Sequence, residues 1–549
     1  TINANQRKSK TNAIALIPHF TSGSSHILDS ITYLGKRIVG SISLICRNGT
    51  ELIGTSDSVV REREGAVRTL FKVCGHYQSA NRRLLPFTLR FYFYQGSHQI
   101  RLLHTFIYDA DQDKDFIQGL GLQIEIPLRD SLYNRYVALS TGEKSIFTEP
   151  IQPLLARHQL RNSIYNNQIN HLTIPEFDKA TAATVSHLAS WDGYRLSQLT
   201  SGTCSVRKRT DSDRPWIGTM EGFRSSGYAF AGDKSGGLSV MLRNFWQSYP
   251  SEIEIQGMRT SNARITVWLW SPNGDPMDMR HYDKVAHGLD ESYEDVQPGM
   301  STPYGIAHTS EIILLPSDTL PSILEMKAIS QKLASANQLL PTPEYLHRVR
   351  AFGVWSLPDK DDQDMEPKLD SLISFYKHQI DEGHWYGFWN YGDFMHTYDH
   401  QRHSWRYDVG GYAWDNTELG TNAWLWYMFL RSGKADIWRM AEAMSRHTCE
   451  TDVYHIGPNA MLGSRHNVSH WGCGAKEARI SQAAWNRFLY YLMADERSGD
   501  LMTEVRDADS MLYTLDPMRL AQPRSKFPCT APARLRIGPD WLAYAGNWM

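Results

Sequence analysis

Two segments in the last third of the chain concentrate residue types that bind acidic groups and transfer protons. The first spans residues 384–418 and the second spans residues 463–473. Both contain arginine, histidine and asparagine, and the first adds several tyrosines. Such side chains neutralise a substrate carboxylate and act as base and acid. Since the two segments have similar chemistry, we expect them to converge on one catalytic site.

This set of residues suits β-elimination in a polysaccharide that contains uronate sugars. A base removes the C5 proton, which is acidic only when the adjacent carboxylate is neutralised, and an acid protonates the departing oxygen. In a galacturonide the C5 hydrogen and O4 lie on opposite faces of the ring. Base and acid should therefore be separate residues on either side of the sugar. The residues that we expect to be catalytic are His466, Tyr412, Arg465 and Asn467.

Nine further residues of the two segments are expected to contact the substrate. Aromatic faces stack on the apolar faces of sugar rings, and polar side chains bind hydroxyl and carboxylate groups. The chain has 17 tryptophans, most of them after residue 350, and several lie in polar, glycine-rich segments where a role in a core is less expected. The expected substrate-binding residues are Trp389, Tyr391, His396, His403, Arg406, Tyr407, Asn416, His470 and Trp471.

Glycoside hydrolysis is the competing chemistry, and it requires a pair of carboxylates. The first segment offers Asp393, Asp408, Asp415 and Glu418. Asp415 and Glu418 resemble the N-cap and first-turn acid of a helix, and Asp408 precedes two glycines as a turn residue does. We interpret these three and Asp393 as structural.

A metal site is not expected. His466 and His470 are four residues apart, but no third ligand stands at a distinctive spacing from them. The six cysteines are scattered and form no CxxC pair. His447 and His455 are expected to face helix packing or solvent. The sequence therefore predicts an enzyme that needs neither a metal nor another cofactor.

Composition limits the class of partner. The 549 residues have a formal net charge of −2, which gives no reason to expect nucleic acid or an anionic membrane as partner. No apolar run approaches the roughly 20 residues that cross a bilayer. The first residue is Thr1 and two glycosylation sequons begin at Asn48 and Asn467, which fits a secreted protein whose signal peptide has been removed. We expect an extracellular enzyme.

The first 315 residues are expected to form strands. Short β-rich runs, many alternating in polarity, begin at residues 90, 100, 122 and 265, and turn residues separate several of them. No alternation of strand and helix is present, so the pattern predicts a large antiparallel β-sandwich. A long polar and aromatic segment around residues 280–304 follows one strand. We expect it to pack over the helical region and contribute substrate contacts.

The period changes near Ser322, where helices are expected at 322–340 and 366–382. An apolar helix, a short turn and a polar helix then begin at Trp424, and the same pattern begins again at Trp485. A third copy opens at Trp541. Repeated helical hairpins build an α/α toroid. Because the last helix has no outer partner before Met549, we expect a further segment or another chain to complete the ring.

Five motifs resemble the exo-rhamnogalacturonan lyases of polysaccharide lyase family 26. They are Trp405-Arg-Tyr-Asp-Val-Gly-Gly-Tyr-Ala-Trp-Asp-Asn, Gly463-Ser-Arg-His-Asn-Val, His470-Trp-Gly-Cys, Asn244-Phe-Trp-Gln-Ser-Tyr-Pro and Tyr293-Glu-Asp-Val-Gln-Pro-Gly. The resemblance covers nearly the whole chain.

The resemblance implies a multidomain α+β protein with an antiparallel β-sandwich followed by an α/α toroid. It places a partial RIFT-type barrel at 1–60, the central sandwich at 61–320 and an incomplete toroid at 321–549. It also implies metal-independent, exo-acting β-elimination at rhamnosyl-(1→4)-galacturonate bonds. A glycoside hydrolase and a non-catalytic carbohydrate-binding homologue remain the alternative functions.

Overall fold

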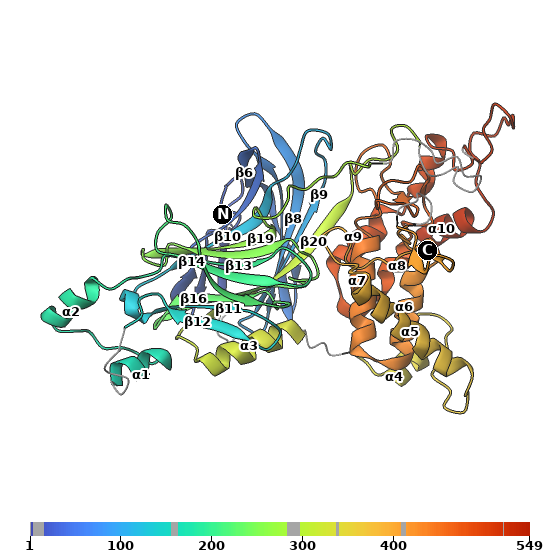
Figure 1. Ribbon diagram of the computed structural model, residues 1–549. Helices are drawn as coiled ribbons and strands as arrows, with labels where there is room; N and C mark the ends of the chain where they lie inside the picture. Colours follow the sequence, from blue (N-terminus) through green and yellow to red (C-terminus); the bar gives the residue numbers. More distant parts are fainter. Residues whose placement is uncertain are drawn as a thin grey trace. The chain divides into compact units, whose positions relative to one another are not determined.

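The computed structural model describes residues 2–3, 16–154, 163–282, 297–335, 340–407, 413–519 and 521–549. Its contacts divide the chain into a β-rich unit and a helical unit (Figure 1). The β-rich unit consists of Thr1–Phe106, Phe116–Met277 and Ser310–Asn337. The helical unit consists of Ile107–Asp115, Asp278–Thr309 and Gln338–Met549.

The β-rich unit is built on one sheet of 16 strands in the order β12-β11-β16-β17-β20-β9-β8-β7-β6-β5-β10-β19-β18-β13-β14-β15. The strands are β5 (Ile42–Asn48), β6 (Thr50–Glu64), β7 (Arg68–Gln78), β8 (Arg83–Tyr94), β9 (Ile100–Ile107), β10 (Gly119–Pro127), β11 (Arg135–Ser140), β12 (Ile146–Pro150), β13 (Gly193–Gln198), β14 (Cys204–Arg209), β15 (Ile217–Gly222), β16 (Tyr228–Asp233), β17 (Gly236–Leu242), β18 (Ser251–Gln256), β19 (Asn262–Trp270) and β20 (Ala307–Ser317). Neighbouring strands with a described register run antiparallel. In Figure 1, β6, β8 and β9 run steeply across the direction of β13 and β14, so the sheet folds over itself as a sandwich.

Some strands of this sheet are buried on both faces. β11, β16 and β17 are buried along their whole length. The helix α3 (Ile323–Ser335) covers part of this region, because its Met326 and Leu333 pack in one cluster with residues of these strands. Two further helices, α1 (Ser163–Ile169) and α2 (Lys179–Ser186), follow β12.

The antiparallel sandwich that the sequence predicts is confirmed, and strands lie at all four of the runs on which the prediction depended. A small four-stranded sheet is formed by β1 (Ile2–Asn3), β2 (Ile17–Phe20), β3 (Ser30–Tyr33) and β4 (Lys36–Val39). The boundary expected at residue 60 falls inside β6, which pairs with β7 on both sides of that point. Strands from the first 60 residues thus belong to the large sheet, and the division into three domains stays a prediction.

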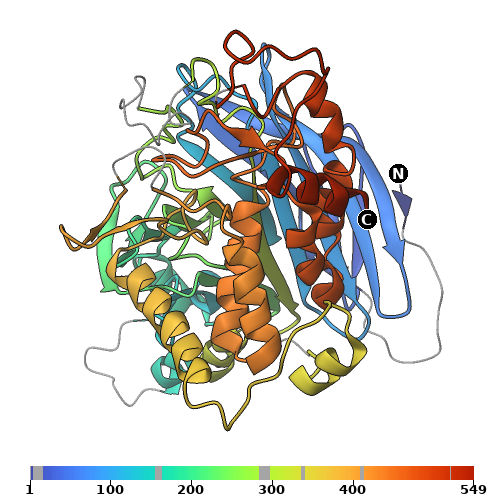
Figure 2. The same cartoon turned by 90° about the vertical axis from the view of Figure 1, so that its right-hand side faces the viewer.

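The helical unit contains two consecutive hairpins, as predicted. Their helices are α6 (Thr421–Ser432) with α7 (Ala435–Thr448), and α8 (Ala483–Met493) with α9 (Glu496–Glu504). Figure 2 shows α6 and α7 side by side in orange, with α5 (Met365–Glu382) in yellow beside them. The other α-helices described in this unit are α4 (Pro343–Val349) and α10 (Pro539–Trp548), and α10 includes Trp541, where the third copy was expected to open.

Short turns that suit their residues connect the two helices of each hairpin. Gly433 ends α6 in the left-handed conformation with φ of 64°, which glycine adopts at low cost. Asp495 caps α9 by accepting a hydrogen bond from the Ser498 amide at 2.9 Å. The same carboxylate forms an ion pair with Arg446 of α7, so the cap of the second hairpin is bound to the first.

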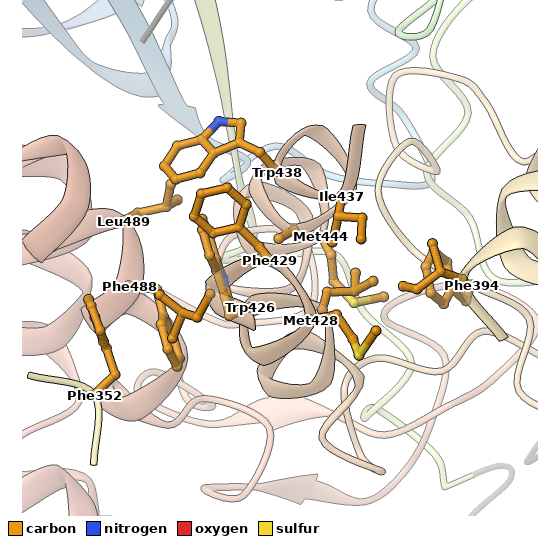
Figure 3. Packing of buried hydrophobic residues seen from close by; sticks show 14 of the residues in the cluster. Phe352, Phe394, Trp426, Met428, Phe429, Ile437, Trp438, Met444, Phe488 and Leu489 are labelled. Atoms are coloured by element: carbon orange, nitrogen blue, oxygen red, sulfur yellow. The ribbon is translucent and has the colours of Figure 1, made fainter. Parts of the chain in front are cut away.

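Aromatic side chains form the core of the helical unit (Figure 3). Phe488 of α8 lies between Trp426 of α6 and Phe352, and its ring centroid is 5.5 Å and 5.1 Å from theirs in nearly parallel stacks. Ile437 and Met444 of α7 belong to the same cluster. Apolar positions of consecutive hairpins therefore share one core, as stacked helical repeats require. In the part of the chain that the structure describes, no helix combines the length and apolarity needed to cross a membrane.

We predict that Phe488→Ala lowers the free energy of unfolding by about 3–5 kcal/mol, because it leaves a cavity between two aromatic rings. The measurement is urea unfolding followed by tryptophan fluorescence. Phe527→Ala is the matched control, since Phe527 is 50% exposed and its truncation should change stability by only about 0.5 kcal/mol. Equal losses in the two variants would contradict a core centred on Phe488.

Candidate active site

A close approach between a loop and α7 places the first group of site residues. Gly392 has φ of +113°, and a Cβ atom there would lie 2.3 Å from the Ala443 carbonyl oxygen of α7. Only glycine fits this position without displacing the helix. The next residue, Asp393, is thereby placed against the last turn of α7, where its carboxylate lies 3.7 Å from Nε2 of His447.

Asn416 joins the two loop segments. Its side-chain amide donates hydrogen bonds of 3.0–3.1 Å to the carbonyl oxygens of Ser464, Arg465 and His470. Its φ is +50°, a conformation that asparagine tolerates better than most residues. The predicted convergence of the loops is thus confirmed. Asn416 is fully buried, however, so it positions the second loop rather than making the substrate contact expected for it.

Glu418 is the centre of a charged cluster. Its carboxylate contacts Nδ1 of His466 and the guanidinium of Arg465, and Arg479 lies 2.7 Å away. His466 and the cations lower the pKa of Glu418 despite the opposing effect of burial. The carboxylate is therefore ionised at neutral pH, and its contact with His466 favours the proton on Nδ1 of the ring. The basic nitrogen of His466 is then Nε2.

His396 lies on the ring of His466. The two imidazole centroids are 4.2 Å apart and the planes are inclined by 23°. Burial and then the neighbouring His466 lower the pKa of His396 from 6.5 to about 4. His396 is neutral at physiological pH, which permits the two rings to stack. The structure therefore brings together three of the expected residues, His396, Arg465 and His466.

A second carboxylate extends the charged cluster. Glu477 contacts both Arg479 and Arg536, and Arg536 also lies 3.3 Å from Asp540 at the start of α10. Asp540 and Glu477 raise the pKa of Arg536. The cluster links the end of the chain to the loop that contains His466.

Four buried residues form another cluster in the helical unit. Nε2 of His447 lies 3.2 Å from both Nδ1 of His470 and Oδ1 of Asp452. Nδ1 of His470 lies 3.4 Å from Oδ2 of Asp393 and 3.5 Å from Oδ1 of Asp452. All four side chains are buried. His470 was expected to bind substrate and His447 to face helix packing or solvent. The structure instead assembles the two rings with two carboxylates.

Lys476 is buried below the second loop. Its ammonium donates hydrogen bonds to the Tyr454 hydroxyl at 2.8 Å, the Trp471 carbonyl at 3.0 Å and the Ser464 hydroxyl at 3.1 Å. Burial lowers the pKa of Lys476 to about 7. These contacts fix the backbone on either side of Arg465 and His466.

The remaining expected residues lie in different surroundings. His403 and Tyr407 are exposed, and Arg406 lies 3.7 Å from Asp399 in a hairpin of β21 (Tyr398–Asp399) and β22 (Ser404–Trp405). Tyr391 stacks on Tyr386. Asn467 is fully buried, and its side-chain oxygen accepts a hydrogen bond from the Val468 amide. Tyr412 and Asp408 lie outside the described residues.

The tryptophans expected to stack on sugars are mostly interior. Trp389 is buried and packs edge-on against Trp471, which donates a hydrogen bond from Nε1 to the Met279 carbonyl. Trp385 and Trp414 belong to the aromatic core of the helical unit. Their polar, glycine-rich sequence surroundings reflect close packing of irregular loops rather than exposure. Trp405 is half-buried.

The polar segment near residues 280–304 packs on this unit, as expected. His281 hydrogen-bonds the Ser469 hydroxyl through Nδ1 at 2.7 Å, and Ser301 donates to the Gly472 carbonyl at 2.6 Å. Both contacts fall on the second loop. Residues 283–296 lie outside the described residues, and the expected substrate contacts of the segment stay a prediction.

Comparison with known proteins identifies the family. Residues 1–331 match the PcRGLX-like protein central beta sandwich domain, and residues 336–549 match the PcRGLX-like protein C-terminal alpha/alpha toroid domain. The chain belongs to the PcRGLX-like family. The resemblance to rhamnogalacturonan lyases is thereby confirmed at the level of the family.

A bacterial protein is similar to most of the chain. The chain is 43% identical over 496 residues to an uncharacterized protein, YetA, of Bacillus subtilis (strain 168). The match covers 89% of this chain and 57% of the relative, so the chain spans a little over half the length of that protein.

Solved structures give only weak matches. The Slr1438 protein of Synechocystis sp. PCC 6803 covers 58% of this chain and 96% of its own, at 11% identity and a TM-score of 0.27. A galactose mutarotase related enzyme from Lactobacillus acidophilus covers 56% and 99%, at 11% identity and a TM-score of 0.25. Such scores support no conclusion about this chain.

Several residues of the two clusters were not predicted from the sequence. Glu418 was interpreted as a first-turn acid of α6, yet α6 begins at Thr421, and Glu418 lies in the preceding loop. Asp393 was also interpreted as structural, and His447 and Asp452 were not connected with His470. The spacing of His447 and Asp452, one at the end of a helix and one just beyond it, was the available signal.

We predict that Asn416→Asp lowers the free energy of unfolding by at least about 2 kcal/mol. Aspartate retains the shape and tolerates the positive φ, but it presents oxygen to three carbonyl oxygens in a buried position. Thermal and urea unfolding measure the loss. Asn170→Asp is the control, because Asn170 is exposed and its amide donates one hydrogen bond, to the Asn166 carbonyl. Unchanged stability of Asn416→Asp would contradict the proposed role.

We predict that His396 makes the protein less stable as the pH falls from about 6.5 towards about 4. The pKa of His396 is lowered to about 4 in the folded state. The contribution of neutral His396 to the free energy of unfolding is therefore complete above a pH of about 6.5. It is lost on acidification, because the histidine of the unfolded chain takes up a proton at a higher pH than the histidine of the folded chain does. The loss is at most roughly 3 kcal/mol. Unfolding of the native chain and of His396→Gln should show a shallower pH dependence for the variant; identical slopes would contradict the prediction.

Proposed function

We propose that this protein is a lyase that cleaves rhamnosyl-(1→4)-galacturonate bonds of rhamnogalacturonan by β-elimination, acting from a chain end. The proposal includes an extracellular substrate, an acidic plant cell-wall polysaccharide, and hence secretion. Membership of the PcRGLX-like family supports the class of reaction. The contact of His466 with Glu418, flanked by two arginines, is the observation on which the proposal rests.

The pairing with Glu418 suits His466 to act as the base. Because the carboxylate accepts the Nδ1 proton, the lone pair is on Nε2 and the imidazole has a fixed orientation. Glu418 also stabilises the imidazolium that forms when His466 takes the C5 proton, as the acid of a catalytic triad does. The neighbouring His396 is neutral, so it adds no positive charge that would oppose protonation of His466.

Arg465 and Arg479 supply positive charge next to this base. Both guanidinium groups contact Glu418, and both have only slight side-chain exposure. In a setting with little water, their charge stabilises the negative charge that develops on the substrate carboxylate as the C5–H bond breaks. The positive charges of two arginines offset the negative charges of two glutamates here. The binding of a negatively charged uronate is therefore not opposed by a strong net negative charge.

The reaction balances without any additional reactant. The C5 proton passes to Nε2 of His466, and the C–H electron pair forms the C4–C5 double bond. The C4–O4 bond breaks, and an acid protonates the departing oxygen. Tyr412 is expected from the sequence to be catalytic and lies outside the described residues. We assign it the role of the acid, because acid and base must flank the galacturonate on opposite faces.

Hydrolysis is less well supported by these residues. A glycosidase requires one carboxyl group that is protonated before reaction. Glu418 has a lowered pKa and forms ion pairs with arginine, so it is suited to remain ionised. Burial raises the pKa of Asp415 to about 8, but Asp415 is buried and accepts a hydrogen bond from the Thr421 hydroxyl. It is suited to support the loop before α6.

We predict that the protein releases products with a C4–C5 double bond from rhamnogalacturonan, and that His466→Ala lowers kcat by at least about 100-fold. The double bond conjugates with the uronate carboxylate and absorbs in the ultraviolet, which gives a continuous assay. His378→Ala is the matched control, because His378 is exposed on α5 and pairs only with Glu382 among the described residues. The control should retain native activity.

Three outcomes would contradict the proposal. Shortening of the polysaccharide without a rise in ultraviolet absorbance would indicate a hydrolase. Binding without shortening would indicate a carbohydrate-binding protein. Native activity in a correctly folded His466→Ala variant, judged by circular dichroism, would remove His466 from the mechanism.

A further inference from the structure

We propose that Asp393, His447, Asp452 and His470 bind one divalent transition-metal ion, and that the donor set favours zinc. The candidate donor atoms are Oδ2 of Asp393, Nε2 of His447, Oδ1 of Asp452 and Nδ1 of His470, and they lie within 4.8 Å of one another. They come from four separate places in the chain. The site lies outside the His466 and Glu418 pair to which the lyase proposal assigns the chemistry.

The spacing of the donors matches a tetrahedron around one ion. Zinc bonds to imidazole nitrogen and carboxylate oxygen at about 2.0–2.2 Å, which places neighbouring donors of a tetrahedral site about 3.3–3.5 Å apart. The separations that involve His447 are 3.2, 3.2 and 3.7 Å. Those from His470 to the two carboxylates are 3.4 and 3.5 Å. These five edges are therefore close to the length that a single central ion requires.

Hydrogen bonds alone satisfy this arrangement poorly. Two ring nitrogens 3.2 Å apart share at most one proton, since two N–H groups would point hydrogen at hydrogen. The two carboxylates share the same small space of low polarity, and they repel each other whenever both are ionised. In the described part of the chain, the ion pairs of Asp393 and Asp452 are formed with these two histidines alone. A central cation removes both conflicts.

Asp452 gives a second, independent indication. Its side chain is fully buried, and among the residues that the structure describes neither of its carboxylate oxygens has a hydrogen-bond partner that meets normal geometry. Buried carboxylates without hydrogen bonds are costly and are found mainly where an ion is bound. Oδ1 of Asp452 faces the ring nitrogens of His447 and His470.

Neighbouring residues fix the orientation of His470 as the surroundings of a metal site do. Its Nε2 lies 3.1 Å from Oδ1 of Asn390, which accepts the Nε2 proton. The lone pair of the neutral ring is then on Nδ1, the nitrogen that faces the other three donors. A hydrogen bond to the far nitrogen is the usual support for a metal-binding histidine.

The donor set and the burial indicate the kind of ion. Two imidazoles with two carboxylates suit zinc, whereas calcium and magnesium prefer six or more oxygen ligands. Four protein donors in a buried position match a closed, structural site rather than a catalytic site with an open position. The ion would then tie the 384–395 loop, the end of α7, the residues after α7 and the 463–473 loop together.

This proposal changes two expectations from the sequence, because it assigns a metal and makes His470 a ligand rather than a substrate contact. An ion bound by His470 would also stabilise the second loop, because His470 is four residues from His466. The sequence did not show that Asp393, His447 and Asp452 accompany His470. These residues are distant from His470 in the sequence, and only the fold brings them near it.

The first experiment measures metal content. The protein, without a polyhistidine tag, is purified in buffers free of chelator and analysed by inductively coupled plasma mass spectrometry. We expect about one equivalent of zinc per chain, and a decrease of at least roughly tenfold in His447→Gln and Asp452→Asn. His455→Gln is the matched control, because His455 is a buried histidine that pairs with Glu504 instead. The control should retain the metal.

The second experiment does not depend on folding of the variants. The native chain is depleted of metal by a chelator and titrated with Co²⁺. We expect visible absorbance bands of tetrahedral intensity that saturate at one equivalent, together with a rise in Tm on addition of Zn²⁺. Metal-free native protein that gives neither the bands nor the rise in Tm would overturn the proposal, as would undiminished metal in a folded Asp452→Asn variant. Both readouts are independent of lyase activity, so a protein that binds zinc but cleaves nothing would contradict only the proposed function.

Discussion

The ion pairs of Glu418 determine how the candidate active site is arranged. One carboxylate contacts the imidazole of His466 and the guanidinium groups of Arg465 and Arg479. Two of these partners are adjacent residues of the second loop, so a single interaction orients a base and a cation together. Because the carboxylate is buried with them, its loss would leave two partly buried cations without compensation. The orientation of His466 and the charge balance of the site both depend on this contact.

Backbone contacts support the loop that presents these groups. The amide of Asn416 binds three of its carbonyl oxygens, and the ammonium of Lys476 binds a fourth at Trp471. The proposed ion would bind the loop again through His470. These side chains come from segments far apart in the sequence, and hairpins of the helical unit bring them near. An irregular loop thus gains the rigidity that positioning of a base requires.

The fold was largely predictable from local patterns, and the site was predictable only in part. Alternating apolar residues identified strands, and the repeated helix pattern at Trp424 and Trp485 identified the hairpins. His466 and Arg465 could be selected by residue type. The role of Glu418 could not, because an acid shortly before a helix is equally explained by capping. The association of Asp452 with His470 depends on tertiary contacts, which no local pattern reports.

Aromatic residues illustrate the same limit. A role in a core was less expected for tryptophans in glycine-rich segments, yet Trp385 and Trp414 are buried in the core of the helical unit. Glycine in these segments permits close packing, as at Gly392 against α7, and does not indicate exposure. Composition indicated a candidate functional region, whereas the distinction between its core residues and its polar clusters required the structure.

Digestion of rhamnogalacturonan in water labelled with heavy oxygen, followed by mass spectrometry of the products, distinguishes elimination from hydrolysis. Elimination breaks the C4–O4 bond without adding water. The proposed elimination therefore gives products that contain no heavy oxygen and whose new end is lighter by one water than a hydrolysis product. Products that incorporate one labelled oxygen at each cleavage would contradict it.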